Sequence, residues 1–453
     1  MIVSPGTTIA ELGLGLRRGS VTASALVEQC LATIADRDQA LNAFITVLAD
    51  DARRQARAAD AELARGIDRG PLHGIPISLK DIIDLAGAPT TAASRLRAGH
   101  RAVTDAPVAA RLRTAGAVLI GKCNLHEFAF GTTGAESAHG PTRNPHAPAH
   151  IPGGSSSGSA VSVATGMAQA SVGTDTGGSI RIPASACGVV GLKPTHGEVS
   201  TAGIVPLAPS LDHVGPLARS VCDAAVLYRI IRDGPHGGDA GADADSRPAD
   251  PRPRLGIPRR YFLDLVEPAV RDTFAAAVER LAKAGCRIDD ADLPHAADTA
   301  PVYLHTQLAE AADYHRATLD DRPDEYCPDV RLRLELGRYV LAEDYVRAQR
   351  GRRILTAEVD AALAHRSALL LPTLPIVPPR LGVESVTIGD TTESTRALTL
   401  RLTQLLDVTG HPAISIPCGT AGGLPAGVQL VGRRGGTERL LALAAALEDT
   451  VRG

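Results

Sequence analysis

The chain has 453 residues, enough for one large α/β unit with a sizeable core or for two or three average domains. Apolar residues make up 44% and charged residues 21% of the sequence, which excludes disorder over most of its length. The 47 basic and 50 acidic residues give a net charge of −3 without a basic stripe, so neither nucleic acid nor an anionic membrane surface is expected as a partner.

The targeting and cysteine patterns indicate a cytoplasmic protein. The amino-terminal MIVSPGTTIAELG lacks the charged and then apolar pattern of a secretory signal, and no apolar run has the length that spans a bilayer. Seven cysteines are scattered without CxxC spacing, and none of the 14 histidines stands at metal-ligand spacing. We therefore expect a reduced protein without a metal ion or a cofactor.

The first part of the chain is predicted to be helical over residues 8–65, where Thr8 and Glu11 form a capping box. From residue 75 onwards the pattern changes to short apolar strands separated by Gly and Pro. These strands are IPISL, AVLIG, MAQASVG and GVVGL. Strands that alternate with helical stretches predict an α/β fold, with a central sheet covered by helices on both faces.

Charge is nearly absent from the middle of this region. Between Asn144 and Leu192 the only charged side chains are those of Asp175 and Arg181. A segment that is both long and poor in charge is typical of the centre of a fold. We therefore expect residues 144–192 to be buried.

The second half begins with residues 233–254, a run rich in Gly, Pro and Asp that predicts a surface loop. The sheet pattern restarts at LGIP, and Val270, Phe274, Val278 and Leu281 then follow at helical spacing, with Gly285 at the end. Further strands are expected at ALLLPTLP, HPAISIP and AGVQLVG, before a last helix at TERLLALAAALEDTVR. We find no internal repeat, and we expect one domain over residues 1–453. Its core comprises about residues 70–232, 255–300 and 365–453.

The segment from about 300 to 365 is helical, charged and rich in tyrosine. It holds five of the seven tyrosines, at positions 303, 314, 326, 339 and 345. Tyrosines gather where a surface meets an amphipathic partner, which predicts either a substrate entrance or a subunit interface such as that of a homodimer. Tyrosines that simply pack a helical subdomain fit the pattern equally well.

Lysine is rare, with four lysines against 43 arginines. An arginine keeps its proton in a protein, whereas a buried lysine can become a neutral amine and act as a base. Lys80, Lys122 and Lys193 each follow a short apolar run, which makes all three candidates without choosing among them.

Residues 150–166, HIPGGSSSGSAVSVATG, allow two local interpretations. Their Gly and Ser content is that of a flexible linker. Gly154–Gly158 also matches G-x-S-x-G, the nucleophile elbow of α/β-hydrolases. That elbow follows a strand, whereas here the preceding NPHAPAHIP contains three prolines, so the match is weak.

A second Gly/Ser stretch, residues 173–188, follows a strand-like segment. Thr176, Gly177 and Gly178 can turn the chain so that backbone N–H groups converge ahead of a short helix, where they could hold an oxyanion. Ser179 lies at this turn and could attack a substrate. The local pattern alone is also that of an ordinary tight turn.

Together, GIPISLKD, PGGSSSGSA and GTDTGGSIRIPASACGVVGLKPT resemble the amidase signature family in order and spacing. The resemblance extends to KCNLHEFAFGTTGAESAHGPTRNP, SLDHVGPLARS and GHPAISIP, and thins at 233–254 and 300–365. It implies a single large α/β fold and amide hydrolysis, with a small-molecule amide as the substrate. Carbamates, anilides and urea-like compounds share the same acyl chemistry.

The resemblance also implies a serine–cis-serine–lysine triad. By motif position, Ser179 is the nucleophile that forms an acyl-enzyme, Ser155 relays the proton and Lys80 is the base. The Gly154–Ser155 peptide is expected to be cis. The backbone around Thr176, Gly177 and Gly178 would hold the oxyanion. Asp175 and Arg181 are expected to order the turn.

The family includes free-standing amidases and the A subunit of the tRNA-dependent amidotransferase, which releases ammonia from glutamine. That subunit usually carries Tyr-Gly-Arg-Val-Ser-Arg after the KPT block, where this chain has THGEVST at residues 195–201. Its usual Asp-Gln-Ile-Gly-Pro is DHVGP at 212–216. These departures favour a free-standing hydrolase, and the alternative is a glutaminase-type subunit that works only inside a complex.

Overall fold

A computed structural model describes residues 7–234 and 252–453 of the chain. In this described part, an 11-stranded sheet runs through the molecule and a separate hairpin joins β10 (Ser385–Ile388) to β11 (Thr391–Ser394). The large sheet has the order β1 (Phe44–Val47), β3 (Val118–Cys123), β2 (Pro76–Lys80), β4 (Ala170–Asp175), β6 (His213–Ala218), β5 (Val190–Lys193), β12 (Ala413–Ala421), β13 (Leu424–Val431), β9 (Ala368–Pro372), β7 (Arg254–Pro258) and β8 (Arg287–Ala291). Parallel and antiparallel pairs are mixed in this sheet, and its fold class is the predicted α/β class.

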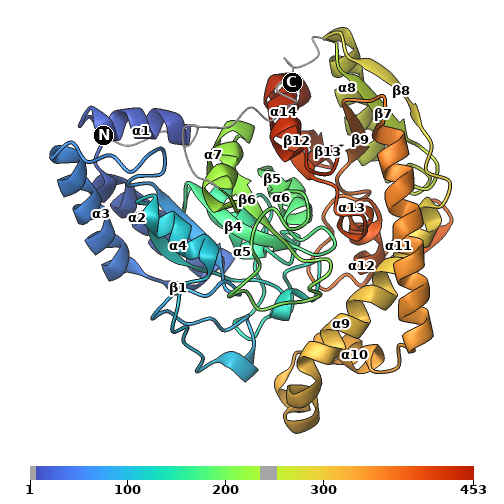
Figure 1. The fold of residues 1–453 in the computed structure, drawn as a ribbon, viewed down its shortest axis with the longest axis horizontal. Helices are drawn as coiled ribbons and strands as arrows, with labels where there is room; N and C mark the ends of the chain where they lie inside the picture. The colour runs from blue at the N-terminus through green and yellow to red at the C-terminus, as the bar shows by residue number, and fades with distance from the viewer. Residues whose placement is uncertain (1–6, 235–251) are drawn as a thin grey trace.

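Helices pack on both faces of this sheet (Figure 1). The α-helices of the described residues are α1 (Ile9–Arg17), α2 (Ala23–Leu41), α3 (Ala49–Ala64), α4 (Pro107–Thr114), α5 (Ser157–Ala164), α6 (Arg181–Cys187), α7 (Val221–Ile231), α8 (Pro268–Lys283), α9 (Thr299–Asp321), α10 (Pro328–Gly337), α11 (Ala342–Leu363), α12 (Thr395–Arg401), α13 (Gln404–Val408) and α14 (Thr437–Arg452). Helices α5 and α6 contact each other and the central strands, whereas α14 contacts α7, α8 and β12.

Most elements lie where the sequence predicts them. The capping box of Thr8 and Glu11 begins α1, and α14 spans the predicted last helix. Residues 151–192 are almost entirely buried, as their lack of charge indicates, whereas residues 145–150 at the start of the predicted segment are exposed or half-buried. The prediction of unbroken helix over 8–65 is wrong at β1, a four-residue strand. Its apolar and β-branched residues (FITV) favour a strand, and it pairs with β3 at one end of the sheet.

The segment from about 300 to 365 folds as the helices α9, α10 and α11, drawn in gold and orange along one side of the molecule in Figure 1. Its tyrosines have different environments. Tyr303 and Tyr326 are buried, whereas 82% of Tyr339 is exposed. Most of the predicted loop 233–254 lies outside the described residues.

Within residues 7–234 and 252–453, no helix combines the length and the apolar character that crossing a bilayer requires. The same part of the chain holds no group of three or more His, Cys, Asp or Glu side chains arranged to bind a metal ion.

Candidate active site

Lys80 is the last residue of β2 and is completely buried. Strands β2 and β4 are parallel neighbours, so their carboxyl ends meet at the same edge of the sheet. The Lys80 amine therefore lies beside Thr174 and donates to Thr174 Oγ1 at 2.7 Å and to Ser155 Oγ at 2.7 Å. Burial lowers the pKa of Lys80 to about 7, although the Asp175 and Asp212 carboxylates act in the opposite direction.

Ser155 reaches Lys80 from the run that resembles a linker in composition. The Gly154–Ser155 peptide bond is cis, as the family resemblance implies. Ser155 is completely buried, and α5 begins two residues later at Ser157. The linker interpretation of residues 150–166 is therefore wrong, because these residues pack inside the molecule.

Ser179 lies at the turn between β4 and α6. Its carbonyl accepts the N–H of Ser156 at 3.2 Å, so the turn lies against the cis peptide. Of Lys80, Ser155 and Ser179, only Ser179 keeps solvent exposure, at 5%. The Ser179 hydroxyl makes no hydrogen bond to another described residue, and in particular none to Ser155.

Some backbone N–H groups of the turn between β4 and α6 have an acceptor within the protein, and others have none among the described residues. The N–H of Gly178, one of the expected oxyanion donors, donates instead to Asp175 Oδ1 at 2.5 Å. The N–H groups of Gly177 and Ser179 have no acceptor among the described residues. Thr176 Oγ1 donates to Asp212 Oδ1 at 2.6 Å. The turn therefore leaves two backbone N–H groups, those of Gly177 and Ser179, without a protein acceptor in the described part of the chain.

Hydrogen bonds made by Asp175 and Arg181 fix the conformation of the turn. Arg181 Nε and Nη2 donate to Asp175 at 2.9 and 3.1 Å, and Arg181 Nη2 also reaches Asp407 Oδ2 at 2.6 Å. All three side chains are completely buried. Burial disfavours the ionised form of Asp175, but the charge and hydrogen bonds of Arg181 outweigh it and hold the pKa of Asp175 below its usual value.

We expect Arg181→Met to destabilise the fold strongly, because it leaves the buried carboxylates of Asp175 and Asp407 without their cation. Removing one partner of a buried ion pair lowers the free energy of unfolding by about 3–5 kcal/mol. Urea unfolding followed by circular dichroism measures this change. Lys283→Met is the control, since among the described residues Lys283 pairs only with the exposed Glu279, and its unfolding midpoint should match the wild type. Equal midpoints for the two variants would contradict the role of Arg181.

Motif matching did not single out Thr174, Asp212 or Asp407. Thr174 immediately precedes Asp175 at the end of a strand, which places it beside the end of a parallel neighbour. Asp407 is the only acidic residue between Leu402 and Val431, a stretch as poor in charge as the one that drew attention to Asp175. That isolation is the signal that could have found it.

The three candidate lysines have different partners. Lys122 forms an ion pair with Asp81 Oδ1 at 3.0 Å. Lys193 donates to the carbonyl of His411 at 2.6 Å, and burial lowers its pKa to about 7 as well. Only Lys80 contacts a serine hydroxyl, so contact distinguishes the lysines where the pKa does not.

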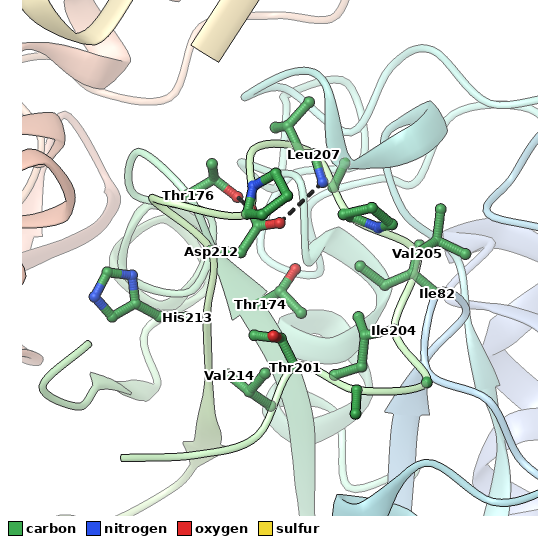
Figure 2. Close-up of a pocket in the computed structure, with 15 residues that line it drawn as sticks. Ile82, Thr174, Thr176, Thr201, Ile204, Val205, Leu207, Asp212, His213 and Val214 are labelled. Carbon is green, nitrogen blue, oxygen red and sulfur yellow. Dashed lines mark hydrogen bonds between the residues drawn. The ribbon is translucent and has the colours of Figure 1, made fainter. Parts of the chain in front are cut away.

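A cavity of about 320 Å³ adjoins this site. Figure 2 shows Thr174 and Thr176 on its wall, with Asp212, which accepts the N–H of Leu207. The other walls are mostly apolar and include Ile82, Ile204, Val205 and Val214. Because Thr174 also accepts from Lys80, the cavity extends to the immediate neighbourhood of the amine.

Comparisons with known proteins show to which family the chain belongs. The family model described as Amidase matches residues 25–441. An amidase of Pseudomonas putida is 39% identical over 91% of this chain and 89% of its own length. The glutamyl-tRNA(Gln) amidotransferase of Roseiflexus sp. (strain RS-1) has an A subunit that is 38% identical over 96% of this chain and 94% of its own. A solved structure, titled as that of an amidase, superposes with a TM-score of 0.91 at 37% identity over 98% of this chain and 99% of that one.

These matches and the mixed α/β fold define the protein as an amidohydrolase of the amidase signature type. The chain belongs to the amidase family, whose model covers nearly its whole length.

Proposed function

We propose that the protein hydrolyses the C–N bond of a carboxylic amide through an acyl-enzyme on Ser179, with Ser155 as the proton relay and Lys80 as the base. The observation that carries this proposal is the 2.7 Å hydrogen bond from a buried amine, Lys80 Nζ, to Ser155 Oγ. Lys80 and Ser155 are shielded from water, and Ser179 lies at the accessible end of the group.

In the first step, Ser179 Oγ attacks the amide carbonyl carbon and gives its proton to Ser155, which gives its own proton to Lys80. A pKa near 7 leaves a substantial share of the Lys80 amine neutral and able to accept this proton. The hydrogen bond between Lys80 and Ser155 supports one of the two contacts that this relay requires. We expect the second contact, from Ser179 to Ser155, to form when substrate binds, since catalytic hydrogen bonds tighten in the complex.

The negative oxygen of the tetrahedral intermediate would accept the free N–H groups of Gly177 and Ser179. Gly178 serves indirectly, because its hydrogen bond to Asp175 fixes the turn that aims its neighbours. When the intermediate collapses, Lys80 returns its proton through Ser155 to the leaving nitrogen. Water then attacks the carbonyl carbon of the acyl-enzyme and gives a proton through Ser155 to Lys80. The bond to Ser179 breaks, the acid leaves, and the proton returns to Ser179.

We further propose that the chain acts as a free-standing hydrolase. Overall similarity does not distinguish the two classes, since the P. putida amidase and the Roseiflexus protein are 39% and 38% identical to it. What supports the proposal is the replacement of the amidotransferase's usual Tyr-Gly-Arg-Val-Ser-Arg by THGEVST at 195–201. Here Glu198 accepts from Tyr228 at 2.7 Å and from Thr437 at 2.6 Å, within the chain itself.

The test is to purify the chain alone, determine its assembly by size-exclusion chromatography and assay it with aryl amides, aliphatic amides, carbamates and glutamine. Hydrolysis by the isolated chain, as a monomer or a homodimer, supports the free-standing enzyme. Glutaminase activity that appears only with added partner subunits would instead support the amidotransferase class.

The pH dependence of hydrolysis should follow the Lys80 amine. Because only neutral Lys80 can accept a proton, kcat/KM should rise about tenfold per pH unit below pH 7 and level off above it. A neutral amide substrate removes ionisation of the substrate from this profile. The control is Lys193→Met, since Lys193 has the same lowered pKa but no contact with a serine, and the inflection should persist in this variant. A profile that is flat across pH 7 in the wild type would contradict the role of Lys80.

A further inference from the structure

The cavity beside the Lys80 amine has a deep apolar part and an exposed mouth. Its deep walls include Ile82 and Val205, which are buried, whereas Thr201 and Ala202 at its mouth are exposed. The cavity has a volume of about 320 Å³. An engineered apolar cavity of roughly 150 Å³ already holds benzene. The space beside Lys80 is therefore large enough for an aromatic ring with several further carbon atoms.

Hydrogen bonds fix the loop that forms one wall of this cavity. The N–H of Val205 donates to the carbonyl of Ile82 at 2.9 Å, which binds the loop to the segment after β2. Towards the other end of the loop, the N–H of Leu207 and the hydroxyl of Thr176 donate to the same Asp212 carboxylate, at 3.0 and 2.6 Å. The cavity is therefore preformed, as ligand pockets usually are.

The cavity lies on the side of the site where the leaving nitrogen is to be protonated. Thr174 lines the cavity and accepts a hydrogen bond from Lys80, the amine that also donates to Ser155. Figure 2 shows the Thr174 side chain between Asp212 and Ile204, which line the cavity with it. A group bonded to a nitrogen that receives its proton from Ser155 therefore has this space next to it.

Other elements cover the glycines of the turn. A side chain at Gly177 would collide with the hydroxyl of Tyr303 on α9, and a side chain at Gly178 would collide with Thr403, which precedes α13. Neither Tyr303 nor Thr403 lines the cavity. Of the turn between β4 and α6, only Thr176 does so. The cavity thus approaches the site from the side of Lys80 and not across the glycines.

The charge of the cavity selects against anions. Among the described residues that line it, Asp212 is the only acidic one, and no lysine or arginine is present. Burial raises the pKa of Asp212 to about 6, although the hydrogen bonds that it accepts act in the opposite direction, so the carboxylate is ionised above that pH. An anionic group would be repelled here, whereas an uncharged apolar group would gain from leaving water.

We propose that this cavity binds the substituent on the leaving nitrogen, so that the preferred substrates are secondary amides whose amine carries an uncharged alkyl or aryl group. This inference rests on the proposed function. When the C–N bond breaks, the nitrogen takes up through Ser155 the proton that Ser179 gave away, and a primary amine is formed. This amine can leave through the mouth at Ala202 while the acyl group is still bound to Ser179.

The test compares amides that share one acyl group and differ in the amine, namely acetamide, N-butylacetamide and N-benzylacetamide. Ammonia and benzylamine are similarly basic, so a difference between their acetamides reports binding of the benzyl group. The wild type should prefer N-benzylacetamide to acetamide by roughly 10- to 100-fold in kcat/KM, with N-butylacetamide between them. With a carboxylate on the ring, 4-(acetamidomethyl)benzoate should be hydrolysed roughly tenfold or more less efficiently than N-benzylacetamide at pH 8.

Two substitutions fill the cavity. Val205→Phe occupies its deep part, and Ala202→Trp narrows its mouth at an exposed position where the fold tolerates a larger side chain. Each should reduce the preference for N-benzylacetamide to less than about threefold. Val346→Phe is the matched control, because it adds the same ring on α11 at a side chain that is 47% exposed and does not line the cavity. Its preference should equal that of the wild type.

A wild type that hydrolyses acetamide and N-benzylacetamide equally overturns the inference while leaving the proposed function intact. So does a preference that neither filling substitution changes, or a loss of both substrates in proportion in folded variants. Faster hydrolysis of 4-(acetamidomethyl)benzoate than of N-benzylacetamide also overturns it, because the preferred amine would then be anionic.

A binding measurement separates the two proposals if no amide is turned over. Calorimetry of Ser179→Ala with N-benzylacetamide and acetamide reports binding without chemistry. Tighter binding of N-benzylacetamide that disappears in Ser179→Ala/Val205→Phe supports the amine pocket even when the hydrolase proposal fails. Equal or absent binding of the two compounds overturns it. Thermal unfolding of each variant shows whether it is folded.

Discussion

Ser179→Ala is expected to lower kcat for amide hydrolysis by roughly 10⁴- to 10⁶-fold, the loss seen when the nucleophile of a serine hydrolase is removed. The fold should be unaffected, because the Ser179 hydroxyl makes no hydrogen bond to another described residue and lies at the accessible end of the site. Single-turnover hydrolysis and thermal unfolding measure the two properties separately.

The control for this substitution is Ser157→Ala. Ser157 belongs to the same GGSSSGS run, but its hydroxyl donates to Thr142 Oγ1 at 3.1 Å and does not contact Lys80. This variant should keep most of its activity. If Ser179→Ala retained more than about a tenth of wild-type kcat, another residue would have to be the nucleophile.

Lys80→Arg and Lys80→Met should each lower kcat by roughly 10³-fold or more. Arginine keeps the positive charge but cannot give up its proton at working pH, so it cannot accept one from Ser155. Methionine has nearly the shape of lysine and fits the completely buried site without an amine. The two variants together therefore separate loss of the base from loss of the charge or the packing.

The control is Lys283→Arg, the same exchange at an exposed lysine that pairs with Glu279, and its activity should equal that of the wild type. Substantial hydrolysis by Lys80→Arg, in a protein shown to be folded, would refute the role of Lys80 as the base. Loss of activity in Lys80→Arg combined with full activity in Lys80→Met would refute it as well.

Local sequence patterns were sufficient for the framework of the site. The apolar runs before Lys80 and Asp175 predict two buried strands, and the lack of charge around residues 144–192 predicts where the centre lies. Which lysine acts could not be predicted from those runs, because Lys80, Lys122 and Lys193 follow similar ones. The choice came from the family resemblance, and the Lys80–Ser155 contact agrees with it.

Strand β6 shows why other elements were missed. Its sequence HVGPLA contains Gly215 and Pro216, which indicate a loop rather than a strand within a sheet. In the structure, β5 pairs only with the last two residues of β6, Leu217 and Ala218. Pro216 therefore lies outside the part of β6 that pairs with β5. Pairing of this kind depends on distant parts of the chain, and no local pattern encodes it.

The unequal exposure of the three proposed triad residues has a practical use. A small serine-directed reagent such as a fluorophosphonate can reach Ser179, whereas Ser155 and Lys80 are completely buried. Under the proposed mechanism its reaction also needs the Lys80 base, which the pairing of β2 with β4 brings next to Ser155. The stoichiometry of labelling therefore counts properly folded molecules, so a preparation can be standardised before its natural substrate is identified.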